Sequence, residues 1–233
     1  PTHKMRWRMF DKNTNLTYNY QEIWNTHSAV IEMLINIFDN DEEKFAQLIR
    51  ECPNLSYKDR KRVLDWADKV YPNIKQEKFS TWETIRKILY NHRSYPDTDW
   101  ALPESELMLL ENLYNKLQPT ETIHKYIWLF NEHWPEFPEG FKYEPNESEK
   151  RFEQQQKHID EARENAVMIF LKEIGVNRTI ELRKIVKEKW ALGDTLAKVI
   201  KSKTDVIKIC DCLYDERNLI SFIHSFIYRK STI

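Results

Sequence analysis

Apolar side chains recur at steps of three and four residues through most of this 233-residue chain. This spacing places them on one face of an α-helix. The first such stretch begins near Tyr20, and its one-face positions are Ile23, His27, Val30, Ile31, Leu34, Ile35 and Phe38. A second stretch starts at the acidic run 39–43 and stops at Pro53. We expect the two to form a helical hairpin with one side of the first helix buried.

Polar capping residues and prolines divide the rest of the chain into further helices. Before residue 131 we expect starts at Ser56, at Ser80 or Thr81, at Pro103, and at Pro119 with Thr120. The longest helix is expected at Ser148 to Ile174, followed by Gly175 in the left-handed position that ends many helices. Shorter helices are expected to start at Asn177, at Gly193 with Asp194 and at Thr204, and the last covers 215–228.

The pattern predicts an all-α fold. No segment alternates apolar and polar residues long enough for a sheet, and no Asn-Gly or Asp-Gly hairpin turn occurs. Helix pairs broken by proline are typical of irregular helical-hairpin repeats, because each pair buries its apolar stripe only against its neighbours. We therefore expect an α-solenoid-like array of about ten helices. A compact helical bundle is the alternative.

One composition shift predicts the domain organisation. Pro135, Pro138, Gly140 and Pro145 fall close together, beside Phe137 and Phe141. We expect an N-terminal helical-hairpin array at 1–133, a connector at 134–147 and a C-terminal helical subdomain at 148–233.

Composition excludes several kinds of site. The chain has 36 Lys plus Arg and 37 Asp plus Glu, so its formal charge of -1 argues against a general nucleic-acid binder. It has 3 glycines, and no two are close enough for a phosphate-binding loop of the Walker or Rossmann type. A G-x-S-x-G nucleophile elbow is also absent. We expect no cofactor and no small-molecule substrate.

The cysteines and the apolar stretches bear on location. Cys52, Cys210 and Cys212 are too few for a disulfide scaffold, which favours a reducing, cytoplasmic compartment. No apolar run is long enough to span a bilayer, so we expect no membrane contact. Because the chain begins at Pro1, we interpret it as part of a longer polypeptide.

The chain has few of the residue patterns that bind metal ions. Helical bundles commonly bind two metal ions through two Glu-x-x-His units. Glu121 and His124 supply one such unit, and no second copy exists. Cys210 and Cys212 lack a second pair at zinc-site spacing. His27 lies within an apolar stripe, where a structural role is expected. We therefore predict no metal site.

One enzymatic alternative remains open. Some helical ribonucleases carry an arginine and a histidine separated by four to six residues, with the arginine on phosphate and the histidine as general acid or base. Arg86 with His92 fits, and so does Arg217 with His224. The second pair is the better candidate because Asn218 follows its arginine directly. About one such match is expected by chance in a chain of this composition.

The eight tryptophans divide into core and surface candidates. Trp82 and Trp128 lie on or beside helix stripes and are expected in the core. Trp100 and Trp134 lie in connecting segments and are the candidate binding residues, because aromatic side chains dominate interface hot spots.

Two stretches carry a family resemblance. They consist of His92, Arg93, Tyr95, Pro96, Asp97, Trp100, Ala101 and Pro103, and of Pro119 with Trp128, Leu129 and Phe130. They resemble the helical-repeat region of large bacterial proteins with a nucleotide-binding STAND or NACHT-type motor. The resemblance implies a sensor arm that recognises a protein partner, often in phage defence, and it transfers no catalytic residue. We predict a non-catalytic scaffold or recognition segment, in contact with a protein partner or neighbouring domains.

Overall fold

The computed structural model describes residues 20–37, 41–70, 79–141, 148–213 and 224–228. Every regular element within these ranges is a helix, and none is a strand. The expected all-α helical array is therefore confirmed. Backbone contacts divide the chain into unit 1, Pro1–Gln118 with Glu136–Lys142, and unit 2, Pro119–Pro135 with Tyr143–Ile233.

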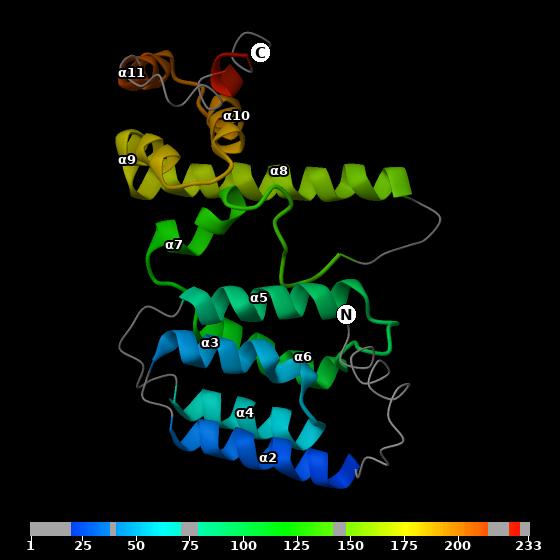
Figure 1. Ribbon diagram of the computed structural model, residues 1–233. Coiled ribbons are helices and arrows are strands. Elements are labelled where there is room, and N and C mark those ends of the chain that lie inside the picture. The colour runs from blue at the N-terminus through cyan, green and yellow to red at the C-terminus, as the bar shows by residue number, and fades with distance from the viewer. Residues whose placement is uncertain (1–19, 38–40, 71–78, 142–147, 214–223, 229–233) are drawn as a thin grey trace, which may run out of the picture. The chain divides into compact units, whose positions relative to one another are not determined.

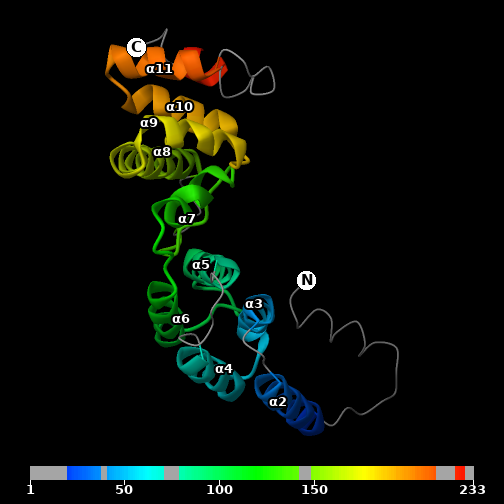
Figure 2. The ribbon, with the colours of Figure 1, turned by 90° about the vertical axis from the view of Figure 1, so that its left-hand side faces the viewer.

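Unit 1 is built from five α-helices and one 3-10 turn in its described part. They are α2 (Tyr20–Asn36), α3 (Glu42–Glu51), η1 (Cys52–Asn54), α4 (Tyr57–Val70), α5 (Phe79–Ser94) and α6 (Glu104–Lys116). Helix α3 packs mainly on α5, α2 packs on α4, and α6 contacts both α4 and α5 (Figures 1 and 2). Fully buried Phe45, Ile49, Val63, Ile85 and Leu89 form the centre of its core.

The first turn of α5 receives its cap from another helix. The expected cap at Ser80 or Thr81 is wrong, because both residues lie inside α5, which begins at Phe79. The buried carboxylate of Glu42 instead accepts a hydrogen bond of 2.7 Å from the backbone N–H of Thr81. A carboxylate at this end of a helix satisfies an unpaired donor and complements the helix dipole. Glu42 therefore links the starts of α3 and α5.

Residues Glu136–Lys142 complete unit 1 by returning to α5. The backbone of Gly140 has φ +72° and approaches the last turn of α5 closely. The N–H of Phe141 donates to Ser94 Oγ at 2.9 Å. The Arg93 guanidinium donates to the carbonyl of Pro138 at 3.1 Å, and the fully buried Arg86 donates to the carbonyl of Glu136. Two arginines of α5 thus hold this segment in place.

Unit 2 is organised around one long helix, α8. Its elements are α7 (Thr122–Tyr126), η3 (Ile127–Phe130), α8 (Ser148–Glu173), α9 (Gly175–Glu181), η4 (Leu182–Lys184), α10 (Lys189–Val199) and α11 (Lys203–Leu213), with a helical turn at 224–228. Helix α8 contacts α7, α9 and α10, and α9 contacts α11 (Figure 1).

The sequence located the ends of some of these helices better than others. Helix α8 matches its expected range, and Gly175 follows it with φ +79°, as predicted. The predicted starts are less accurate. Helix α9 begins at Gly175 rather than at Asn177, and Gly193 is a buried residue inside α10. Helices α7 and α11 begin at Thr122 and Lys203, within two residues of the expected Thr120 and Thr204. Most of the expected helix 215–228 lies outside the described residues.

The division between the units falls inside the expected connector. The buried Arg163 of α8 donates to the carbonyls of Leu129 at 2.9 Å, Glu132 at 3.0 Å and His133 at 3.3 Å, which holds that segment in unit 2. The next residues, from Glu136, are bound to α5 of unit 1 instead. The division into an array at 1–133, a connector at 134–147 and a subdomain at 148–233 stays a prediction.

Candidate binding groove

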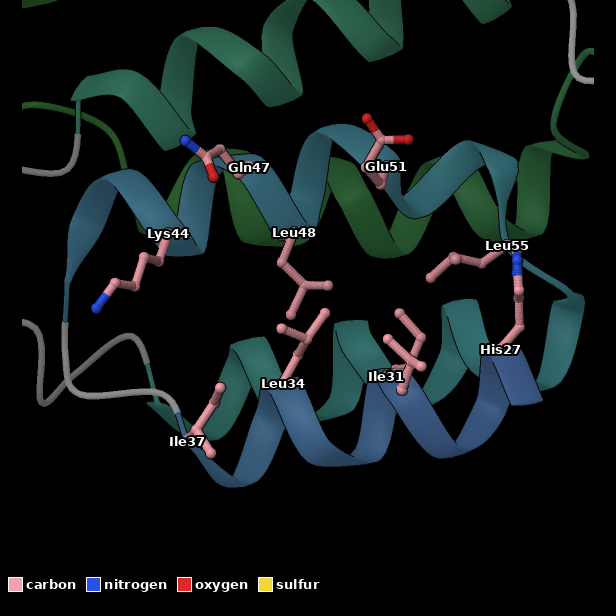
Figure 3. Close-up of a pocket in the computed structure, with 10 residues that line it drawn as sticks. His27, Ile31, Leu34, Ile37, Lys44, Gln47, Leu48, Glu51 and Leu55 are labelled. Atoms are coloured by element: carbon pink, nitrogen blue, oxygen red, sulfur yellow. The ribbon is translucent and has the colours of Figure 1, made fainter. Parts of the chain in front are cut away.

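An apolar groove of about 560 Å³ lies between α2 and α3 in unit 1 (Figure 3). Its lining residues are His27, Val30, Ile31, Leu34 and Ile37 from α2 and the residue after it, Lys44, Gln47, Leu48 and Glu51 from α3, and Leu55. Leu34 and Leu48 point toward each other across it. The other described residues of its lining, which are Val30, Ile31, Leu34, Ile37, Leu48 and Leu55, are aliphatic.

Helix α2 leaves part of its apolar face uncovered. Ile31 is buried, whereas Val30 is 44% exposed, Leu34 40% and Ile37 63%. The expectation that this whole face is buried is therefore wrong. The expected hairpin is only partly realised, because α2 and α3 face each other across the groove while α2 packs on α4 and α3 on α5.

A buried polar network fixes α2 on α4. The carboxylate of Asp59, which is 1% exposed, accepts hydrogen bonds from the hydroxyl of Ser28 at 2.9 and 2.7 Å and from that of Ser56 at 2.8 Å. The Ser56 oxygen in turn accepts from the N–H of Asp59 at 3.2 Å, which caps the start of α4. This network sets the position of the groove wall that α2 provides.

The two charged side chains of α3 that line the groove point in different directions. Lys44 points toward α2 at the end where Ile37 is found, whereas the Glu51 carboxylate points away from α2 (Figure 3). The Lys44 ammonium lies 3.7 Å from the Asp41 carboxylate, in a pair that is largely exposed. The Glu51 carboxylate accepts a hydrogen bond of 3.1 Å from the Asn54 amide. Both side chains are exposed to solvent at the rim.

The groove has the chemistry of a binding surface. Among the described residues that line it, three are ionisable, which are His27, Lys44 and Glu51, and none is a serine, threonine or cysteine that could act as a nucleophile. In the described part of the chain, no group of three or more histidine, cysteine, aspartate or glutamate residues is placed to hold a metal ion. Exposed aliphatic side chains are stabilised when another apolar surface removes them from water.

The two tryptophans expected to bind a partner lie in different units, and neither is among the lining residues of the groove. Trp100 is 40% exposed in unit 1, with its ring 5.1 Å from that of His92 and 6.0 Å from that of Tyr95. Trp134 is half-buried in unit 2, with its ring 5.6 Å from that of His133 and 4.9 Å from that of Phe152. Trp82 and Trp128 are buried, as predicted.

The Arg86 and His92 pair is part of the core of unit 1. Arg86 is fully buried, and the imidazole Nδ1 of buried His92 accepts a hydrogen bond of 3.0 Å from the N–H of Leu102. Burial, with the Arg60 guanidinium adding to it, lowers the pKa of His92 to about 4, against the opposing effect of Glu106. His92 is thus a neutral hydrogen-bond acceptor that positions the loop before α6.

The other candidate residues are only partly within the described chain. Arg217 lies outside the described residues, while His224 is exposed and its ring stacks 6.1 Å from that of Tyr228. His124 Nδ1 lies 3.4 Å from a Glu121 carboxylate oxygen on the neighbouring turn. Cys52 is buried, and the side chains of Cys210 and Cys212 are outside the described set.

The sequence and the structure were compared with those of known proteins. No known protein-family model, curated protein or solved structure matches the chain. The described helices include none that combines the length and the apolar character required to cross a bilayer.

The sequence missed the groove, although it carried a signal for it. Val30, Met33, Leu34 and Ile37 add to Ile31 and Ile35 to make an apolar arc around much of α2. One neighbouring helix covers only a stripe of such an arc. An apolar arc wider than one neighbour can cover indicates a second contact, but the sequence alone does not identify what provides it.

Proposed function

We propose that this chain is a non-catalytic recognition module that binds a protein partner through the groove between α2 and α3. The observation that carries the proposal is the row of solvent-exposed aliphatic side chains, Val30, Leu34 and Ile37, along one wall of a preformed groove. Apolar surfaces of this kind, rimmed by polar residues, mark interaction sites.

The lining favours a polypeptide over a small molecule. Small-molecule sites surround the ligand and direct several polar groups at it. Here the polar side chains lie near the ends and along the rim, and the aliphatic wall stays open to solvent. A partner that lays an apolar segment along the wall would remove that surface from water without needing directed polar contacts.

The wider setting belongs to the same proposal. The resemblance around Trp100 and Trp128 supports a place within a longer bacterial cytosolic protein, where helical arrays of this kind recognise partners. The chain would then supply recognition, and any motor or effector activity would reside in neighbouring domains. Trp100 and Trp134 remain candidate contacts of such partners on surfaces separate from the groove lining.

A paired substitution tests the groove. Leu34→Asp places a charge in the apolar wall, whereas Met33→Asp alters an exposed residue of the same helix that does not line the groove. Peptides selected by display against the wild-type chain should bind Met33→Asp normally. They should bind Leu34→Asp at least about tenfold more weakly, because the partner loses apolar contact and desolvates a carboxylate.

Circular dichroism of both variants provides the folding control, because residue 34 is already partly exposed and its substitution should leave the helical content unchanged. Selected peptides that bind Leu34→Asp as tightly as wild type would show that recognition occurs elsewhere. A selection that returns no binding peptide would remove the support for a peptide-binding groove.

A further inference from the structure

Four aromatic side chains form one partly exposed surface in unit 2. The ring of His133 lies 5.6 Å from those of Trp134 and Trp190, and the ring of Trp134 lies 4.9 Å from that of Phe152. Phe152 is 57% exposed and Trp190 is 37% exposed. We propose that this aromatic surface, defined as His133, Trp134, Phe152 and Trp190, binds single-stranded nucleic acid. The proposal goes beyond the groove, which belongs to unit 1.

A buried arginine holds part of this surface in place. The guanidinium of Arg163, which is 2% exposed, lies 5.7 Å from the centre of the Trp190 ring and donates to the carbonyls of Glu132 and His133. The indole N–H of Trp190 donates to the Glu188 carboxylate, which also lies 3.8 Å from the imidazole Nδ1 of His133. Rings that are fixed before binding lose little conformational entropy when a partner stacks on them.

The segment around Trp190 is basic, although the whole chain has a formal charge of -1. Residues 172–208 contain ten Lys or Arg and five Asp or Glu. Each of the five carboxylates accepts a hydrogen bond or forms an ion pair within unit 2. In the described part of the chain, no ion pair forms at Lys172, Arg178, Lys187, Lys189, Lys201 or Lys203. The overall charge therefore hides a local surplus of cations.

Two of these lysines adjoin the aromatic surface. Lys187 and Lys189 precede Trp190 by three residues and by one residue. The backbone N–H of Lys187 donates to the side-chain oxygen of Asn131 at 3.2 Å, which joins it to the segment that carries His133. Lys187 is exposed and Lys189 is half-buried. Cations and aromatic rings thus occur together in one part of unit 2.

This combination favours one class of partner. A single-stranded nucleic acid has flat bases that stack on aromatic rings and a phosphate backbone that attracts lysines. A duplex keeps its base faces inside the stack, and an acidic polypeptide supplies negative charge without a series of flat rings. Trp134, which the sequence suggests as a protein contact, therefore receives a different partner in this proposal.

Fluorescence anisotropy with labelled probes of about 15 nucleotides tests the proposal on the full chain. Oligo(dT) and oligo(U) distinguish DNA from RNA, a duplex of the same length tests the need for exposed bases, and a polyglutamate peptide measures the effect of charge alone. At least one of the single strands should bind about fivefold more tightly than the duplex and polyglutamate, because stacking adds to the charge attraction.

Two substitutions test the aromatic rings. Trp190→Leu removes a ring but keeps an apolar side chain, and it should weaken binding of the single strand about tenfold. Phe152→Leu, at a more exposed position, should weaken binding in the same direction. Circular dichroism of both variants checks that the helical content is unchanged.

A double substitution tests the lysines. Lys187→Gln with Lys189→Gln should reduce the slope of log Kd against log salt concentration by about 1.4, because each phosphate contact on a single strand contributes about 0.7. Lys58→Gln with Lys61→Gln makes the same change of charge at exposed positions of α4 in unit 1. This matched control should leave both the affinity and the slope close to those of wild type.

The proposal is overturned if no nucleic-acid probe binds at about 50 mM salt, where phosphate contacts are strong. It is also overturned if polyglutamate or the duplex binds as tightly as the single strands while folded Trp190→Leu and Phe152→Leu bind like wild type. The first of these results with polyglutamate would identify an acidic protein as the partner. The groove variant Leu34→Asp should bind the oligonucleotides normally, so this proposal and the proposed function can fail separately.

Discussion

Acidification should destabilise unit 1 through His92, because this histidine is neutral in the folded state. Its imidazole Nδ1 accepts the N–H of Leu102 and so links the end of α5 to the start of α6. Burial and the nearby Arg60 guanidinium lower its pKa from 6.5 to about 4. Unfolding exposes the ring to water and restores the ordinary pKa.

The direction and size of the effect follow from this difference. Between pH 6.5 and pH 4 the unfolded chain binds a proton at His92 and the folded chain does not, so the free energy of unfolding falls as the pH falls. The full contribution is present above pH 6.5. At about 1.4 kcal/mol per pKa unit, this one group accounts for a loss of about 2 kcal/mol at pH 5 and about 3 kcal/mol below pH 4.

Urea unfolding of wild type and His92→Gln at several pH values between 7 and 4.5 measures the effect. Glutamine offers an amide oxygen to the Leu102 N–H and does not titrate. The variant should be less stable at pH 7 but should lose less stability on acidification, since the carboxylates common to both chains cancel in the comparison. Parallel pH profiles for the two proteins would refute a neutral, buried His92.

Three further predictions concern glycines, a thiol and catalysis. Gly140→Ala should lower the free energy of unfolding by about 3 kcal/mol, because its Cβ would lie 2.6 Å from that of Arg93 at φ +72°. Gly175→Ala, with φ +79° and open space, should cost about 1 kcal/mol, and equal losses in calorimetry would contradict the close approach. Burial raises the pKa of the Cys52 thiol from 9.0 to about 12, so its alkylation at pH 8, followed by peptide mass spectrometry, should be about 1000-fold slower than in urea. Comparable rates would show that Cys52 is accessible. The purified chain and His224→Ala should leave RNA equally intact, and cleavage lost only in the variant would instead support the ribonuclease alternative.

Local sequence signals predicted the helices of this chain well. Pro103 precedes α6, and Gly175 follows α8 in the left-handed conformation that glycine adopts at low cost. Both signals act within a few residues of the chain. The start of α5 was missed because its cap comes from Glu42, nearly forty positions earlier, and such a contact leaves no local pattern.

The roles of individual polar residues were harder to predict. Arg86 and His92 have the spacing of a catalytic pair, yet in the structure they hold two loops of unit 1 on α5. The sequence gives the spacing of such residues but not their burial, and burial decides whether a histidine titrates near neutral pH. Likewise, the division after residue 135 depends on two buried arginines. Arg163 of unit 2 binds the carbonyl of Glu132, and Arg86 of unit 1 binds that of Glu136.

The groove follows from how α2 is attached. Apolar contacts tolerate sliding, whereas hydrogen bonds hold donor and acceptor within narrow limits of distance and angle. Because Ser28 of α2 donates to the buried Asp59 carboxylate of α4, α2 could move toward α3 only by breaking those bonds. The aliphatic side chains Leu34 and Ile37 therefore stay exposed even though covering them would be favourable. A partner that covers them need not displace α2, and this is the physical basis for proposing the groove as a recognition site.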